Sequence, residues 1–214
     1  MKCLICDKEC ERFEDTRWRI EYYECYSCGF IMKSTKNFSS FSEQKQRYDL
    51  HNNNQESEGY RAYFERFVNF LLPHINQPQN ALDFGCGASS LLAQILTENQ
   101  INTDFYDPIY HPKEVYKEKK YDLIVSVEVF EHLHTPKEIF KMLVDHLNPK
   151  GYLAIQTAFY QNDRERFLHW HYRLDPTHVI FFSLKSLEKL ADIFNMRVIK
   201  NDAKQMILMQ KKNS

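Results

Sequence analysis

The sequence has no excess of positive charge and no long hydrophobic run, and each absence excludes a class of protein. Lysine and arginine total 28 against 29 for aspartate and glutamate, so the formal net charge is −1. A chain with this balance has no basic surplus that would hold nucleic acid by counterion release, and nucleic acid is not an expected partner. The longest apolar runs, such as the one at 123–129, already carry Ser and Glu. A transmembrane helix needs about 20 apolar residues, so no membrane span is expected.

The first seven residues also lack an apolar stretch of signal-peptide length, and they already include the charged residues Lys2 and Asp7. Secretion is therefore not expected, and the cytoplasm is the expected location. What the chain does contain is 214 residues, 43% hydrophobic and 14% aromatic, which suffice for one enzyme-sized domain with a small appendage. In a reducing compartment the six cysteines are expected to be metal ligands or free thiols rather than disulfides.

Four of the cysteines have the spacing of a zinc ribbon. Cys3 and Cys6 form one Cys-x2-Cys pair, Cys25 and Cys28 form the other, and 18 residues separate the pairs. Two such knuckles offer four thiolates in a tetrahedral arrangement, so residues 1–33 are predicted to form a zinc ribbon that depends on its metal for folding. Unligated cysteines of a ribbon that has lost its metal are the alternative. A thioredoxin-type pair is disfavoured because neither pair lies at the turn of a βαβ unit.

The cysteine module is followed by a polar segment rich in Ser, Asn and Gln. This composition predicts a linker at 34–59 with one short helical piece at 42–48. Apolar residues at a helical period over 60–72, ended by Pro73, then predict a helix at the start of a domain that occupies 60–214.

The start of this domain has the pattern of a nucleotide-type ligand site. A short apolar strand runs into Asp83 and is followed by the turn Gly85-Cys86-Gly87 and an amphipathic helix. Glycines let a ligand approach the backbone closely, and the new helix points its unpaired amide groups at that ligand.

A second carboxylate complements this turn 20 residues past Gly87. The strand expected at 102–106 ends in Asp107 and Pro108, a place from which a carboxylate can accept both hydroxyls of a ribose. A dehydrogenase is the rival interpretation, but its G-x-G-x-x-G turn needs glycine where this sequence has Ser90.

These residues resemble the first motif of the class I S-adenosylmethionine-dependent methyltransferases, an acidic residue followed by G-x-G-x-G, with Ser89 in place of the third glycine. The resemblance implies S-adenosylmethionine as the cofactor. It also implies that Asp83 lies near the methionine amino group, that Gly85 and Gly87 lie against the methionine and ribose, and that Asp107 binds the ribose hydroxyls.

Two further stretches agree with this resemblance. YDLIVSVEVFEHL at 121–133 and LNPKGYLAI at 147–155 resemble the fourth and fifth motifs of the same superfamily. Only 13 residues separate the second carboxylate from the third strand, so that crossover is short and the loop 126–128 is expected to help hold the adenine. The expected cofactor-binding set is completed by Cys86, Pro108 and Glu128.

An aromatic and histidine-rich stretch, WHYRLDPTHVIFF at 170–182, follows the strand expected at 152–157. Ligands bind at this edge of a doubly wound sheet, so this stretch is the candidate acceptor site. The candidate catalytic residues are His178 as a base that titrates near neutral pH, Asp175 to orient it, and His132. An equally open alternative is that Asp175 and His178 only turn the chain into a strand at 179–182.

A sharper hypothesis concerns Glu128, Glu131, His132 and His178. Two carboxylates and two histidines could hold a divalent ion such as Mg, Mn or Zn. The alternative is that Glu131 and His132 merely shape the turn after the strand.

Over nearly its whole length the sequence resembles a bacterial family of type 23 methyltransferases with an N-terminal zinc ribbon. The expected fold is α/β, a Rossmann-like class I methyltransferase domain with a zinc-ribbon-like module, closed by a helix at 183–194 and an antiparallel hairpin at 196–200 and 205–210. The expected activity is methyl transfer from S-adenosylmethionine to a small molecule or carrier-bound metabolite. Two alternatives stay open: an inactive adenosylmethionine-binding adaptor, and an RNA or protein methyltransferase that uses the ribbon for docking.

Overall fold

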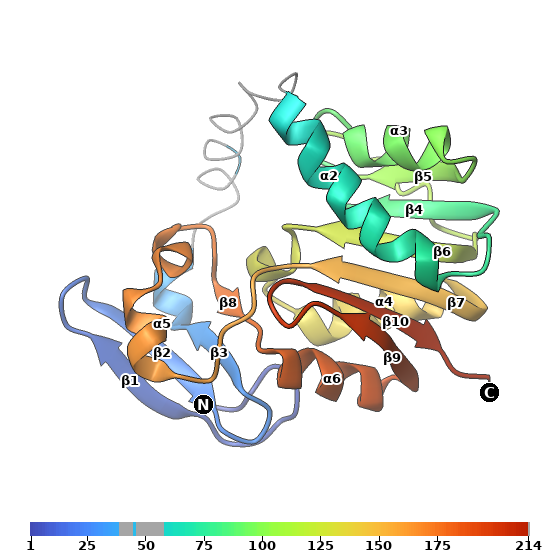
Figure 1. Cartoon of the computed structure of the whole chain (residues 1–214). Coiled ribbons are helices and arrows are strands. Elements are labelled where there is room, and N and C mark those ends of the chain that lie inside the picture. Colours follow the sequence, from blue (N-terminus) through green and yellow to red (C-terminus); the bar gives the residue numbers. More distant parts are fainter. Residues whose placement is uncertain (39–44, 46–57, 214) are drawn as a thin grey trace.

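The computed structural model describes residues 1–38, 45 and 58–213 of the chain. It contains two sheets (Figure 1), an antiparallel one in the order β1-β2-β3-β8 and a six-stranded one in the order β5-β4-β6-β7-β10-β9. The expected α/β fold with an N-terminal β module is confirmed. The short helical piece expected at 42–48 lies, apart from Lys45, outside the described residues. No helix in the described part of the chain is long and apolar enough to cross a membrane.

The N-terminal residues supply three strands of the small sheet, β1 (Glu11–Asp15), β2 (Ile20–Cys25) and β3 (Phe30–Lys33). The middle strand of this module, β2, begins at Ile20, after a turn in which Arg19 adopts a φ of 53°. β1 and β3 flank β2 in antiparallel register.

The fourth strand of the small sheet comes from the other end of the chain. The strand expected at 179–182 is confirmed as β8 (Ile180–Phe181), which pairs with β3 so that Phe181 lies opposite Ile31. Phe181 also packs with Tyr22 of β2 and with Phe167 in a buried aromatic cluster. The N-terminal module therefore shares its sheet with β8 (Figure 1) and its aromatic core with Phe167 and Phe181.

The large sheet is parallel in its first four strands and antiparallel at its far edge. The parallel strands are β4 (Asn80–Phe84), β5 (Asn102–Tyr106), β6 (Tyr121–Val127) and β7 (Leu147–Gln156). The antiparallel edge is the expected hairpin, β9 (Met196–Asn201) and β10 (Met206–Lys211). Residues 148–151 form a bulge within β7, where Lys150 has a φ of 62°.

Helices cover both faces of this sheet because successive residues of a buried strand point in opposite directions. On β6, Leu123 and Val125 pack under α2 (Glu58–Leu71) and α3 (Leu91–Glu98), the first of which confirms the helix expected at 60–72. Ile124 faces the other side, where the helices are α4 (Pro136–Asp145) and α6 (Leu184–Ile193).

Loops at the carboxyl ends of the parallel strands carry most of the candidate site residues. Between β5 and β6 the chain forms only turns and one isolated bridge, Asp107 with His111, which confirms the short crossover. After β7 the chain forms α5 (Arg164–His169) and the 3-10 turn η5 (His171–Leu174) before it enters β8. We call residues 157–179 the insertion.

Candidate functional site

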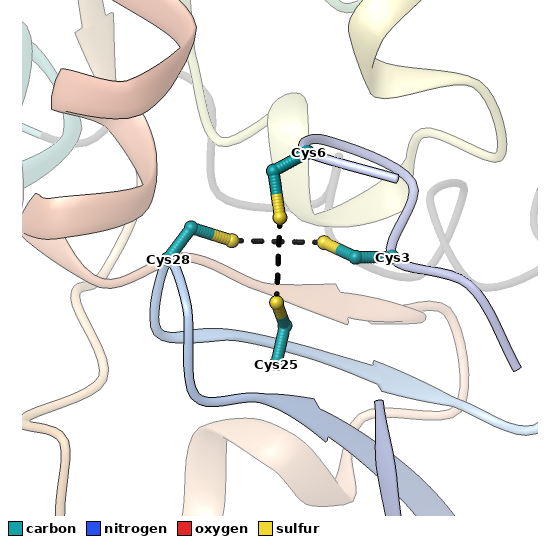
Figure 2. Close-up of side chains that lie close together, drawn as sticks. All are labelled: Cys3, Cys6, Cys25 and Cys28. Carbon is teal, nitrogen blue, oxygen red and sulfur yellow. Dashed lines mark hydrogen bonds between the residues drawn. The ribbon is translucent and has the colours of Figure 1, made fainter. Parts of the chain in front are cut away.

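Four thiols of the N-terminal module point toward one centre (Figure 2). They belong to Cys3, Cys6, Cys25 and Cys28, and all four sulfur atoms lie within 4.8 Å of one another. The Sγ atoms of Cys3 and Cys28 are 3.6 Å apart, and those of Cys6 and Cys25 are 3.4 Å apart. A tetrahedral zinc site with Zn–S bonds of about 2.3 Å places its sulfurs about 3.8 Å apart, so the donor set and spacing fit zinc.

One hydrogen bond in this cluster shifts two thiol pKa values in opposite directions, that of Cys28 upward and that of Cys3 downward. The hydrogen bond with the Cys28 thiol lowers the pKa of Cys3 to about 5, which favours the thiolate, the form that binds metal. Cys10 packs beside the cluster, and burial raises its pKa to about 12, so its thiol stays neutral. The cluster is thus a candidate closed, structural metal site of four cysteines.

The turn after β4 has the backbone geometry that the glycines predicted. Gly85 and Gly87 have φ angles of 82° and 64°, in the left-handed region. A Cβ atom on Gly85 would lie 2.3 Å from Cγ2 of Val129, whereas a Cβ on Gly87 would meet nothing within 4 Å. Gly85 is therefore required by packing, and Gly87 leaves backbone beside open space where a ligand can approach. Ser90 takes a φ of 46° at the N-cap of α3.

Asp107 closes this turn from the neighbouring strand. Its Oδ2 accepts a hydrogen bond from the Gly87 amide at 3.2 Å, and its Oδ1 accepts from the amides of Ile109 and Tyr110 at 2.8 and 3.0 Å. The carboxylate is thereby held in one orientation. Since each carboxylate oxygen has more than one acceptor site, it can still accept hydroxyl groups of a ligand.

Asp83 lies beneath the same turn and is only 2% exposed. Its Oδ2 is buried and has no hydrogen-bond partner among the described residues. Burial raises the pKa of Asp83 to about 7, and the Asp107 carboxylate adds to this effect. A buried carboxylate oxygen without a donor is costly, so this position fits a ligand that brings a positive charge or a donor.

The remaining residues expected to bind the cofactor differ in how far they are exposed near the glycine turn. Cys86 is buried and its thiol faces the Gly87 carbonyl, while Pro108 is exposed beside Asp107. The loop expected at 126–128 is wrong for its first two residues, which belong to β6, and Ser126 is fully buried there and donates to the Phe84 carbonyl.

Glu128 is part of an acidic cluster that the insertion covers. Its carboxylate accepts from the hydroxyl of Tyr63 at 2.9 Å and lies 3.2 Å from the hydroxyl of Tyr172, which is 2.7 Å from Glu131. Burial, together with the Glu131 carboxylate, raises the pKa of Glu128 to about 8. Burial also raises the pKa of Glu131, which accepts a hydrogen bond from Thr157.

The two candidate histidines lie together at this cluster. The rings of His132 and His178 are 4.8 Å apart, and burial lowers the pKa of both, that of His178 to about 3. The Nδ1 atom of His178 lies 2.7 Å from the Tyr172 carbonyl. The Asp175 carboxylate accepts from the amide and hydroxyl of Thr177, so it shapes the turn, as the structural alternative stated.

Three residues at the site are not indicated as site residues by the sequence. Tyr63 contacts Glu128 from α2, and only the helical periodicity of α2 places it on an inward face. Thr157 holds Glu131 from the end of β7. Lys33 is 3% exposed and donates to the Asp175 carbonyl at 2.8 Å, and burial lowers its pKa to about 8. Nothing in the local sequence around Lys33 indicates that it is buried.

Comparison with known proteins agrees with this geometry. Residues 56–201 match the sequence profile of a methyltransferase domain family, type 23. The chain belongs to this family. No curated protein sequence matches the chain. As a member of this family, the protein is an S-adenosylmethionine-dependent methyltransferase, and the family implies that cofactor.

Solved methyltransferase structures share the fold. An O-methyltransferase family protein from Burkholderia thailandensis superposes with a TM-score of 0.60 at 11% identity, covering 81% of this chain and 62% of that one. The plantazolicin methyltransferase BpumL gives 0.51 at 16% identity, with 81% and 92% covered. The mitomycin 7-O-methyltransferase MmcR gives 0.53 at 12% identity, with 74% and 59% covered. The chain thus spans less than two thirds of the first and third structures. The type 23 methyltransferase shares its fold with these proteins, and at such low identity the likeness extends no further.

Proposed function

We propose that this methyltransferase acts on a small molecule or carrier-bound metabolite that binds between the cofactor turn and the insertion. One observation carries the proposal: the buried, unpartnered Oδ2 of Asp83 lies at a glycine turn that Asp107 closes, among the described residues. A ligand with an ammonium group and a ribose would satisfy Asp83 and Asp107 at once.

The proposed cofactor contacts follow from these positions. Asp83 receives the amino group of S-adenosylmethionine, Gly85 and Gly87 lie against its methionine and ribose, and Asp107 accepts the ribose hydroxyls. Cys86, Pro108 and Glu128 are proposed to complete the contacts with the cofactor. When bound, S-adenosylmethionine supplies an electrophilic methyl group on a sulfonium. The chain then has chiefly to align the acceptor with that methyl group and to exclude water.

The acceptor is proposed to lie against the insertion. Trp170 and Tyr172 stack with their ring centroids 4.8 Å apart and offer an aromatic wall, with His178 beside Tyr172. A pKa near 3 makes His178 a weak base at neutral pH, so we propose that His178 and His132 contact the acceptor, while Asp175 holds the turn that carries His178. BpumL and MmcR are named for plantazolicin and mitomycin, and this supports a small-molecule acceptor.

The four-cysteine cluster is proposed to bind zinc in a structural role. Cys3, Cys25 and Cys28 are buried in the same core as Phe182, so the metal would stabilise the junction between the N-terminal module and the methyltransferase domain.

A binding and transfer experiment tests the proposal. S-adenosylhomocysteine should bind the full chain in calorimetry. Asp107→Asn should weaken binding about 10- to 100-fold because it removes a charged acceptor worth roughly 1.5–3 kcal/mol. Asp104→Asn is the matched control: Asp104 is on the same strand but binds Lys119 and Tyr121.

Transfer of labelled methyl groups to a fractionated cell extract then identifies the acceptor class. Label in the small-molecule or carrier-bound fraction is the expected result. Label only in RNA or in other proteins would overturn the acceptor proposal, and binding without any labelled product would favour the adaptor. If S-adenosylhomocysteine does not bind, the proposed cofactor contacts are overturned.

A further inference from the structure

Glu131, His132 and His178 form a compact group of metal-binding side chains apart from the cysteine cluster. One carboxylate oxygen and one ring nitrogen from each histidine all lie within 4.8 Å of one another. We propose that these three side chains bind a divalent transition-metal ion. The site is additional to the four-cysteine site, and the proposal goes beyond methyl transfer itself.

Hydrogen bonds orient both imidazoles for this role. Nδ1 of His132 lies 2.9 Å from the Thr177 carbonyl, and Nδ1 of His178 lies 2.7 Å from the Tyr172 carbonyl. A carbonyl oxygen only accepts, so each Nδ1 carries the proton and each neutral ring has its lone pair on Nε2. Metal-binding histidines in proteins typically donate their other N–H to a carbonyl or carboxylate in this way.

The carboxylate of Glu131 is held facing these rings. Its Oε1 is 3.9 Å from Nε2 of His132, and its side chain is 1% exposed. Tyr172 and Thr157 donate to its two oxygens at 2.7 and 2.9 Å, which fixes its orientation. Carboxylates that bind metal ions in proteins are typically oriented by hydrogen bonds of this kind.

Charge at the cluster also favours a cation. Glu128 and Glu131 both face the hydroxyl of Tyr172, whose single proton can serve only one of them at a time. Among the described residues, Lys33 is a cation near both histidines, and its Nζ donates to the backbone carbonyl of Asp175. Two carboxylates side by side, that of Glu131 buried and that of Glu128 half-buried, are costly when both are ionised, and a divalent ion would offset that cost.

The ligand types select the kind of ion. Two imidazoles and one carboxylate suit Mn²⁺, Fe²⁺, Co²⁺, Ni²⁺ or Zn²⁺, whereas Ca²⁺ and Mg²⁺ prefer oxygen ligands. Three protein ligands leave coordination positions open, which distinguishes this site from a closed four-cysteine site.

The proposed ion would lie close to the cofactor crevice. α2 spans both places, since Tyr63 contacts Glu128 and Tyr60, one turn away, lies near Asp83 and Ser89. An acceptor oxygen could therefore fill an open position of the ion beside the methyl donor. This last point alone rests on the proposed function.

Manganese binding to the full chain tests the site. Mn²⁺ is the probe because it prefers oxygen and nitrogen ligands over thiolates and gives an electron paramagnetic resonance signal. The protein, without an affinity tag, is dialysed against EDTA, its zinc content is measured, and it is titrated with Mn²⁺. The wild type should bind one equivalent, and Glu131→Gln and His178→Ala should each weaken binding at least tenfold. His169→Ala is the matched control, because His169 is an exposed histidine of the same insertion whose Nδ1 lies 2.8 Å from the Glu165 carbonyl.

The outcomes separate this inference from the proposed function. If the wild type keeps two metal equivalents after dialysis, loss of one in Glu131→Gln supports the site. Binding that is unchanged in Glu131→Gln and His178→Ala, or no manganese and only one zinc in the wild type, overturns it. Circular dichroism checks that each variant is folded, and S-adenosylhomocysteine binding is measured on the same samples. Cofactor binding without a second metal would reject the metal site alone.

Discussion

Arg173 of the insertion donates a hydrogen bond to the carboxylate of Asp15, at the end of the first strand of the N-terminal module. The guanidinium is 2% exposed and also donates to the Tyr22 hydroxyl at 3.0 Å and to the Leu168 carbonyl at 3.1 Å. This buried ion pair joins parts of the chain that are 158 residues apart in sequence. The insertion is therefore anchored to the N-terminal module.

Removal of this arginine should destabilise the protein strongly. Arg173→Met leaves the Asp15 carboxylate buried without its partner, so the free energy of unfolding should fall by about 3–5 kcal/mol. Urea denaturation measures the change. Arg166→Met is the control: the Arg166 side chain is 78% exposed, and its contact with Asp163 is 3.4 Å long. The control should change stability by less than about 0.5 kcal/mol. An equal fall in the free energy of unfolding in both variants would contradict a stabilising role for the ion pair of Arg173 and Asp15.

Alanine at the two glycines of the cofactor turn should have different effects. Gly85→Ala forces a methyl group against Val129, so the melting temperature should fall by several degrees. Gly87→Ala meets no neighbouring atom and should cost only about 1 kcal/mol from its left-handed backbone. Its methyl group occupies ligand space, however, so S-adenosylhomocysteine binding should fall at least tenfold. Normal binding by a folded Gly87→Ala variant would show that the ligand does not approach this backbone.

Zinc content should depend on the four clustered cysteines and not on the fifth one nearby. Cys25→Ser should lose the metal equivalent and lower the melting temperature, because ligation contributes to folding. Cys10→Ser should keep the metal, since its sulfur is not one of the four that converge (Figure 2). Atomic absorption on both variants checks this. Retention of zinc in the first variant, or its loss in the second, would change the assigned ligand set.

Cofactor affinity should depend on pH through Asp83. In the ligand-free protein burial raises the pKa of this carboxyl to about 7, well above its unfolded value of 3.8. An ammonium group prefers the ionised form, so below pH 7 the ligand must displace a proton. Affinity for S-adenosylhomocysteine should therefore fall toward tenfold per pH unit below about pH 7 and level off above about pH 8.

Asp83→Asn should bind more weakly at pH 8 and lose most of this dependence. Calorimetry between pH 5.5 and 8 gives both curves. A wild-type curve that is flat across this range would mean that Asp83 does not receive the amino group.

The elements with local signals were predictable from sequence, and the contacts between distant segments were not. The glycine turn at Gly85, the paired cysteines and the amphipathic helix at 60–72 each have a short-range pattern with a physical cause. By contrast, β8 contains two residues, and its pairing with β3 depends on packing by Phe181 against the N-terminal module. Nothing in the order of residues near either strand indicates its partner.

The same division applies to the site. Sequence placed Glu131 and His132 together because they are neighbours, and the structure then brought His178 to them. Sequence left two roles open for Asp175, and the structure shows its hydrogen bonds to Thr177 within the turn. The burial of Lys33 could not be foreseen, because it results from the insertion folding over the end of β3.

The pairing of β3 with β8 also affects how the chain is made. The ribosome completes strands β1 to β3 long before β8, yet their sheet gains its last strand only when residues 180 and 181 have emerged. Non-local pairing of this kind slows folding, since a long loop must close before the contact forms. The N-terminal module is therefore among the last parts of this chain to reach its final structure, and until then the β3 edge is open to wrong partners.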